Sequence, residues 1–134
     1  MLEIMVLDTH IWFWLMTQEF ERFPDHWREK IDTAQTVGVS PLSCYEIALA
    51  HQRRRLELPC AANEWFKQAL DPAGICLLPL TSEITFKAVK LSPIHRDPFD
   101  RMIMATALEY HANLASIDKK IAQYPEVQSL LLQP

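Results

Sequence analysis

Four acidic side chains in this sequence stand where an apolar segment stops or is interrupted. Asp8 and Asp118 each follow a short apolar run. Glu46 falls inside an apolar helical stripe, and Asp100 lies near the start of an expected helix. Carboxylates from four separate segments, with no histidine or thiolate between them, describe a site for a hard cation, and oxygen ligands suit Mg²⁺ or Mn²⁺. Such an ion activates water and stabilises the oxyanions of an in-line phosphoryl displacement.

Two of the acids near residue 100 also have a simpler interpretation. Asp97 is a good N-cap, Pro98 fits the first helical position, and Asp100 then falls in the first turn, close to the positive end of the helix dipole. Arg96 and Arg101 are alternative partners that would neutralise this stretch without a metal ion. The capping role is sufficient for Asp97, whereas Asp100 fits the wider acidic set better.

Glu46 has two interpretations as well. On a helix it shares a face with Leu42 and Leu49, so it interrupts an apolar stripe and does not line the wet face. A buried glutamate is rare without a partner. One partner would be a nearby arginine in a buried ion pair, which is costly to form. The other would be a cation shared with the remaining acids.

Composition limits the classes of protein to consider. The chain has 134 residues, 49% of them hydrophobic, and a net charge of −4, which argues against binding nucleic acid by bulk electrostatics. A nuclease whose acids hold metal ions stays possible, because bound cations invert the local charge. Cys44, Cys60 and Cys76 are widely spaced, so neither a disulfide framework nor a zinc site is indicated, and a cytoplasmic protein is expected. The N-terminus lacks the basic region of a signal peptide, and the longest apolar run, residues 11–16, is too short to span a bilayer.

Strand-like apolar runs alternate with helical patterns along the chain. The expected strands are 4–7, 37–39, 75–78 and 114–117, with a last edge strand at 128–132. The expected helices are 9–16, 24–35, 40–54, 63–70, 81–91 and 98–111, with a short one through residue 124. This alternation predicts an α/β fold around a mostly parallel sheet, in one domain that spans residues 1–134.

The predicted topology would bring two of the acids together. In an open parallel sheet, ligands bind beyond the carboxyl ends of the strands, where the strand order reverses. Asp8 and Asp118 each come at the end of an apolar strand. We therefore expect both carboxylates at the same edge of the sheet, although a loop or capping residue would explain either of them alone.

The motifs around these acids resemble those of the PIN-domain family, and in particular the VapC-type toxin ribonucleases. The resemblance covers essentially the whole chain. It is carried by Val-Leu-Asp-Thr-His at 6–10, Ser-Pro-Leu-Ser-Cys-Tyr-Glu-Ile-Ala at 40–48, His-Arg-Asp-Pro-Phe-Asp-Arg at 95–101 and Leu-Ala-Ser-Ile-Asp at 114–118. The last motif has serine where the family often has threonine, which is a slight departure.

The resemblance implies a three-layer α/β/α sandwich with a five-stranded sheet. It also implies a Mg²⁺-dependent endoribonuclease, with Mn²⁺ as an alternative ion, that cleaves RNA and is neutralised by a cognate VapB-like antitoxin. A homodimer is the expected assembly. By matching position, the catalytic and metal-binding residues would be Asp8, Glu46, Asp100 and Asp118. The small hydroxyl residues Thr9 and Ser116 would brace these acids, and Asp97 matches a family position too.

Two other functions fit part of the pattern. A phosphatase of the haloacid-dehalogenase kind also begins with a strand that ends in aspartate. That class needs a second aspartate two positions later as general acid, and here the position is His10. The third possibility is a catalytically silent binding domain of the PIN fold, against which the intact set of four acids argues.

Overall fold

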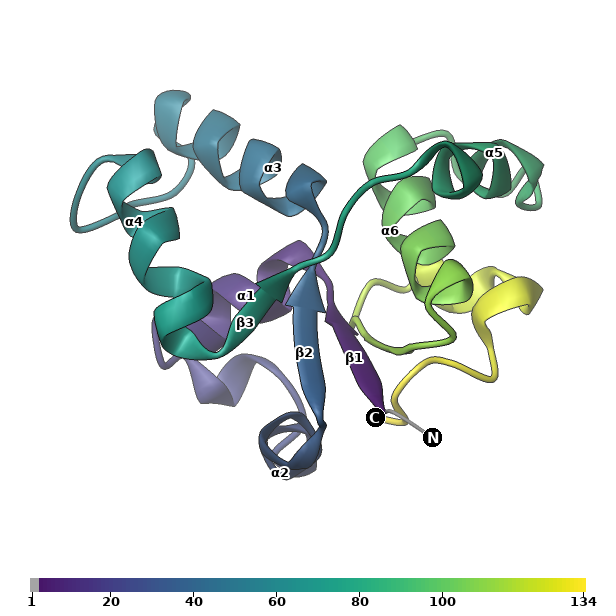
Figure 1. Cartoon of the computed structure of the whole chain (residues 1–134), viewed down its shortest axis with the longest axis horizontal. Helices are drawn as coiled ribbons and strands as arrows, with labels where there is room; N and C mark the ends of the chain where they lie inside the picture. The colour runs from purple at the N-terminus through teal and green to yellow at the C-terminus, as the bar shows by residue number, and fades with distance from the viewer. Residues whose placement is uncertain (1–2) are drawn as a thin grey trace.

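The computed structural model describes residues 3–134 and has a parallel four-stranded sheet at its centre (Figure 1). The strands are β1 (Ile4–Leu7), β2 (Thr36–Val39), β3 (Ile75–Leu77) and β4 (Asn113–Ala115). Their order is β3-β2-β1-β4, and each neighbouring pair is parallel. The chain moves outward from β1 to β3 on one side and returns to add β4 on the other. This reversal places a topological switch point at the carboxyl end of β1.

Helices separate the strands, as the alternating sequence pattern predicts. In the described part of the chain they are α1 (Thr9–Met16), α2 (His26–Thr33), α3 (Pro41–Gln52), α4 (Ala62–Ala69), α5 (Ser82–Lys90) and α6 (Pro98–Glu109). Short 3₁₀ turns occupy Phe20–Arg22, Asp71–Ala73, Ile121–Gln123 and Pro125–Val127. No helix within residues 3–134 is both long and apolar enough to cross a membrane.

Side-chain caps fix where several helices begin. The Ser40 hydroxyl accepts a hydrogen bond from the backbone N–H of Leu42 at the start of α3. Thr81 caps α5 in the same way, and Asp97 caps α6. All three starts were predicted from the sequence. Helix α2 is shorter than the expected 24–35, because Ala34 already has an extended backbone that leads into β2.

The expected fifth strand at 128–132 was wrong. This segment runs beside β4, but it forms only an isolated parallel bridge between Leu114 and Leu131. Leu114 donates its N–H to the Leu130 carbonyl at 2.8 Å, and Leu132 donates to the Leu114 carbonyl at 3.0 Å. The N–H groups of Leu130 and Leu131 turn back to the carbonyl of Val127, so they are unavailable for a longer ladder.

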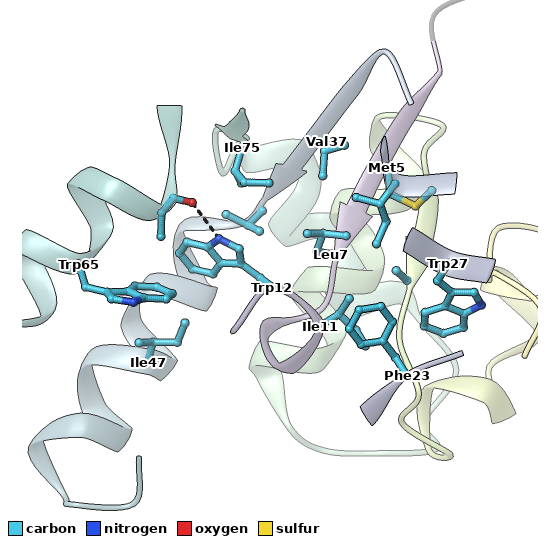
Figure 2. Packing of buried hydrophobic residues seen from close by; sticks show 14 residues of the cluster. Met5, Leu7, Ile11, Trp12, Phe23, Trp27, Val37, Ile47, Trp65 and Ile75 are labelled. Carbon is cyan, nitrogen blue, oxygen red and sulfur yellow. Dashed lines mark hydrogen bonds between the residues drawn. The ribbon is translucent and has the colours of Figure 1, made fainter. Parts of the chain in front are cut away.

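Strand β1 is buried on both faces, as its unbroken apolar run predicts. Met5 and Leu7 belong to one buried cluster, whereas Val6 between them belongs to another. Figure 2 shows the first cluster, in which helices α1 to α4 contribute Trp12, Trp27, Ile47 and Trp65. Helix α6 and the C-terminal segment cover the opposite face with Ile103, Met104, Ile121 and Tyr124. The fold is therefore a three-layer α/β/α sandwich, as expected.

Candidate active site

A pocket of about 540 Å³ opens at the carboxyl ends of β1 and β4. Every acid singled out in the sequence lines it: Asp8, Glu46, Asp97, Asp100 and Asp118. They come from the ends of two strands, from α3 and from the start of α6. The pocket lies at the switch point of the sheet, which is where ligands bind in open α/β folds.

Asp8 is the most buried of these acids, with 7% of its surface exposed. It caps α1, and its Oδ1 accepts the backbone N–H of Thr9 at 2.8 Å. Its Oδ2 accepts the Ser116 hydroxyl at 2.7 Å. Because each carboxylate oxygen has a second lone pair, both oxygens retain capacity for a further ligand. The two hydrogen bonds therefore orient Asp8 without saturating it.

Glu46 is half-buried on α3 and is also bound by a hydroxyl. Thr9 Oγ1 lies 2.6 Å from Glu46 Oε1 and 2.8 Å from the Ser43 hydroxyl. An ionised carboxylate only accepts, so the single Thr9 proton points to Glu46 while Ser43 donates to Thr9. Among residues 3–134, no arginine or lysine lies within salt-bridge distance of Glu46. The alternative of a buried ion pair with an arginine was therefore wrong.

Asp100 lies in the first turn of α6, where its contact is a histidine. The Asp100 Oδ2 atom is 3.2 Å from His95 Nε2. Asp97 caps the helix by accepting the N–H of Phe99 at 2.9 Å. Within the described residues, no arginine forms a salt bridge with Asp97 or Asp100, because Arg101 donates to backbone carbonyls. The proposed neutralisation of this stretch by its own arginines was therefore wrong.

Asp118 does not follow its strand directly. Strand β4 ends at Ala115, and Ser116 occupies the position at the strand end. The N–H of Asp118 donates to the Ser116 hydroxyl at 3.1 Å, and Asp118 Oδ1 accepts the N–H of Lys120 at 2.8 Å. Ser116 thus connects Asp118 to Asp8 through one hydroxyl.

The pocket disfavours negative charge. Burial raises the pKa of Asp8, although the hydrogen bonds from Ser116 and Thr9 oppose this shift. Burial likewise raises the pKa of Glu46, and the carboxylates of Asp8 and Asp97 add to the increase. The pKa of Asp100 rises to about 7, because the group is buried and the other four carboxylates surround it. A divalent cation would relieve both the burial and the repulsion.

The donor set fits such a cation. Carboxylate oxygens from four segments provide the ligands that Mg²⁺ and Mn²⁺ prefer. Ligand atoms of His95, Asp97 and Asp100 lie within 4.8 Å of one another, which is the tightest such group in residues 3–134. Asp8, Glu46 and Asp118 line the same pocket beside this group. The arrangement has the chemistry of a divalent-metal site for hydrolysis of a phosphate ester.

Sequence reasoning missed several residues of the pocket. His10, Trp14, His95 and Lys120 line it with the acids. Trp14 packs against the buried cluster of Figure 2, and its ring also lies beside that of His10, with ring centroids 5.4 Å apart at an interplanar angle of 40°. The nearness of His95 to Asp97 and Asp100 in the sequence was the one available signal for a histidine in the site.

Comparisons with known proteins agree with this fold. The family model described as "PIN domain" matches residues 5–127, so the chain belongs to the PIN domain family. A curated relative, "Ribonuclease VapC22" of Mycobacterium tuberculosis, is 27% identical over 120 residues, which cover 89% of this chain and 90% of the relative.

Two solved structures share the fold. VapBC2 from Rickettsia felis, bound to a DNA fragment from its promoter, matches with a TM-score of 0.68 and 16% identity over 96% of this chain and 97% of that one. A toxin-antitoxin complex from Klebsiella pneumoniae matches with a TM-score of 0.60 and 16% identity over 96% of both chains. At this identity the likeness establishes the fold.

Proposed function

We propose that this chain is a VapC-type endoribonuclease that hydrolyses RNA phosphodiester bonds with a divalent ion, Mg²⁺ or alternatively Mn²⁺. One observation carries the proposal: five carboxylates from four separate segments line one pocket at the switch point of a PIN-family sheet. The curated relative, which this chain matches over 90% of the relative's length, is named as a ribonuclease. In this proposal Asp8, Glu46, Asp100 and Asp118 are the catalytic and metal-binding residues.

The other side chains of the pocket have supporting roles. An ion held by these carboxylates supplies an activated water and neutralises oxyanion charge in the displacement. The Ser116 hydroxyl fixes one oxygen of Asp8, and the Thr9 hydroxyl fixes one oxygen of Glu46. Asp97 keeps α6 in place as its N-cap, which sets the position of Asp100 one turn later. The hydroxyls thus present the carboxylates to a cation in defined orientations.

A dehalogenase-like phosphatase is disfavoured by the pocket itself. Such an enzyme would need an acid two positions after Asp8, and His10 occupies that position with its ring against Trp14. The alternative of a catalytically silent binding domain is tested by the cleavage assay described below. The single domain over residues 1–134 and the cytoplasmic location stay predictions of the sequence.

We further propose two macromolecular partners, RNA as substrate and a protein antitoxin as inhibitor. Support for the antitoxin comes from the two solved structures of the same fold, which are described as VapBC2 and as a toxin-antitoxin complex. The homodimer expected from the sequence is also a proposal. Size-exclusion chromatography with light scattering, on the chain alone and with the product of an adjacent antitoxin gene, tests both assemblies.

The function is tested by incubating the purified protein with total cellular RNA in Mg²⁺ and in EDTA. Cleavage is expected in Mg²⁺ alone. Asp8→Asn should lose activity by at least about 100-fold. Even the loss of a residue that only hydrogen-bonds to a metal ligand lowers metal affinity or activity by roughly 10- to 100-fold. Asp32→Asn is the matched control, because Asp32 is an exposed acid on α2 that does not line the pocket. Equal cleavage by a folded Asp8→Asn protein would refute the proposal, and no cleavage by wild type would favour the silent domain.

A further inference from the structure

The tightest group of possible metal ligands in the pocket includes a nitrogen donor. His95, Asp97 and Asp100 each offer one ligand atom, and these atoms lie within 4.8 Å of one another. The four acids of the proposed ribonuclease site offer only oxygen. Oxygen ligands select hard cations such as Mg²⁺, whereas imidazole favours borderline transition metals. The position of His95 therefore bears on which cations this pocket accepts.

The backbone of His95 is held by two side chains from α6 and the C-terminal segment. Its N–H donates to the hydroxyl of Tyr124 at 2.8 Å, and its carbonyl accepts from the same hydroxyl at 3.0 Å. The Arg101 guanidinium donates to the His95 carbonyl at 3.2 Å. Tyr124 is fully buried, so this support is rigid. The loop before α6 thus presents the imidazole to the pocket from a fixed anchor.

Arg101 extends this support along the loop. It donates to the carbonyls of Ser92 at 2.9 Å and Leu91 at 2.8 Å, in addition to its contact with His95. The guanidinium is therefore occupied with backbone acceptors. In the described part of the chain, the only hydrogen-bond partner of the His95 side chain is Asp100.

The separation of the two side chains suits shared ligation. His95 Nε2 and Asp100 Oδ2 are 3.2 Å apart. Two ligands about 2.1 Å from one ion are roughly 3.0 Å apart at octahedral angles and roughly 3.4 Å apart at tetrahedral angles. The observed distance falls between these values. A cation bound by both atoms would take the place of the contact between them.

We propose that His95 supplies a nitrogen ligand, together with Asp97 and Asp100, and that this ligand confers tight binding of borderline cations such as Zn²⁺ on the pocket. The inference rests on the proposed metal-dependent function, because it concerns the same pocket. Zn²⁺ binds most sites more tightly than Mg²⁺. The proposal is therefore specific in one respect: the affinity for Zn²⁺ should depend on His95. Mg²⁺, which is held by oxygen, should bind almost independently of this residue.

The test is calorimetric titration of the whole chain with Zn²⁺ and, separately, with Mg²⁺. His95→Gln should raise the Kd for Zn²⁺ by roughly tenfold or more, since a lost ligand costs at least as much as a lost outer partner. The Kd for Mg²⁺ should stay nearly unchanged. His10→Gln is the matched control, because His10 lines the same pocket but lies outside the ligand group, and it should leave both constants unchanged.

A direct readout excludes zinc bound elsewhere, for instance at the cysteines. The imidazole nitrogen resonances of His95, assigned by their absence in His95→Gln, should shift when Zn²⁺ is added. Unshifted His95 resonances at zinc saturation would overturn the proposal. An equal loss of Zn²⁺ and Mg²⁺ affinity in His95→Gln would also overturn it, and would mean that His95 orients Asp100 by its hydrogen bond. Failure of RNA cleavage in Mg²⁺ with intact zinc binding at His95 would refute the ribonuclease and leave this inference standing.

Discussion

The two sides of the acidic pocket position their carboxylates by different means. On the first side, here called the hydroxyl side, Asp8 and Glu46 each accept a hydrogen bond from a short hydroxyl residue. On the second, the α6 side, Asp97 and Asp100 lie at the start of α6 next to His95. The hydroxyl donors are buried, Thr9 as the first residue of α1 and Ser116 directly after β4. On the α6 side no hydroxyl within residues 3–134 donates to Asp97 or Asp100, and the support comes from Tyr124 and Arg101, which bind the backbone of the preceding loop.

The pKa values of the carboxylates on the two sides are also set by different combinations of causes. Hydrogen bonds to the carboxylates on the hydroxyl side oppose the increase in pKa that burial causes there. At Asp100, burial and neighbouring carboxylates raise the pKa to about 7, and these causes all act in the same direction. Hydrogen bonds thus fix the carboxylates of the hydroxyl side, whereas at Asp100 burial and repulsion raise the pKa without such an opposing hydrogen bond. Variants on the two sides should therefore fail in different ways.

The largest expected effect is on activity, at Glu46 on the hydroxyl side. Glu46→Gln keeps the shape and an acceptor for the Thr9 hydroxyl, but it removes a charge that burial and nearby acids disfavour. We expect stability in EDTA equal to or above that of wild type, together with a loss of Mg²⁺-dependent cleavage of at least about 100-fold. Chemical denaturation in EDTA and a cleavage assay on the same preparation measure both. A clear loss of stability with retained cleavage would make Glu46 structural and redraw the site around Asp8, Asp100 and Asp118.

The next largest effect is on stability, at the support of the α6 side. Arg101→Met keeps the aliphatic stem but leaves carbonyls of the loop before α6 without their donor. Since each orphaned acceptor costs about 1–3 kcal/mol, we expect the free energy of unfolding to fall by about 2–4 kcal/mol. Urea denaturation measures this loss.

Arg96→Met is the matched control for that measurement. Arg96 is an exposed arginine in the same loop, so its replacement should change stability by less than about 0.5 kcal/mol. Similar losses in both variants would mean that the contacts of Arg101 with backbone carbonyls do not support the loop.

Much of the hydroxyl side was predictable because its positions follow local rules. The end of an apolar strand places Asp8 at the sheet edge, and the interrupted helical stripe places Glu46 toward the pocket. Strand pairing then brings β1 and β4 together, so Asp118 lies near Asp8. These steps depend on strand and helix periodicity and on the switch-point rule, which a single sequence contains.

The rest depended on tertiary contacts that no local rule specifies. Pairing of Arg101 with the nearby acids was one alternative from the sequence, but the fold brings loop carbonyls within its reach. His95 enters the pocket because Tyr124, far along the chain, fixes its backbone. The last segment reads as a strand by composition, yet its N–H groups bond back to Val127.

A further effect is expected from pH, and it should come mainly from the α6 side. The pKa of Asp100 rises from the ordinary 3.8 to about 7 in the folded protein. Between these values the native state binds more protons than the unfolded state, so stability in EDTA should fall as pH rises from about 4 to about 7. Asp100→Asn should flatten this slope, and saturating Mg²⁺ should oppose it. Thermal melts across this range measure the effect, and an unchanged slope in Asp100→Asn would assign it to other groups.

The smallest expected effect concerns an aromatic contact between the two sides. Tyr45 adjoins Glu46 on α3, Phe99 adjoins Asp100 on α6, and their rings stack with centroids 5.4 Å apart. Such a pair contributes roughly 0.5–1.5 kcal/mol, and the low end applies because Tyr45 is 55% exposed. Tyr45→Ala should therefore lower stability by about 0.5 kcal/mol and weaken Mg²⁺ binding slightly, because α3 and α6 lose a contact that sets their spacing.

Two variants make that last comparison decisive. Tyr45→Phe keeps the ring and should match wild type in both stability and Mg²⁺ affinity. Phe86→Ala removes an exposed aromatic ring on α5 that has no aromatic partner among the described residues, so it should leave Mg²⁺ affinity unchanged. If Tyr45→Ala behaves like Phe86→Ala in calorimetric titrations with Mg²⁺, the two sides of the pocket are held together by the sheet and the core alone.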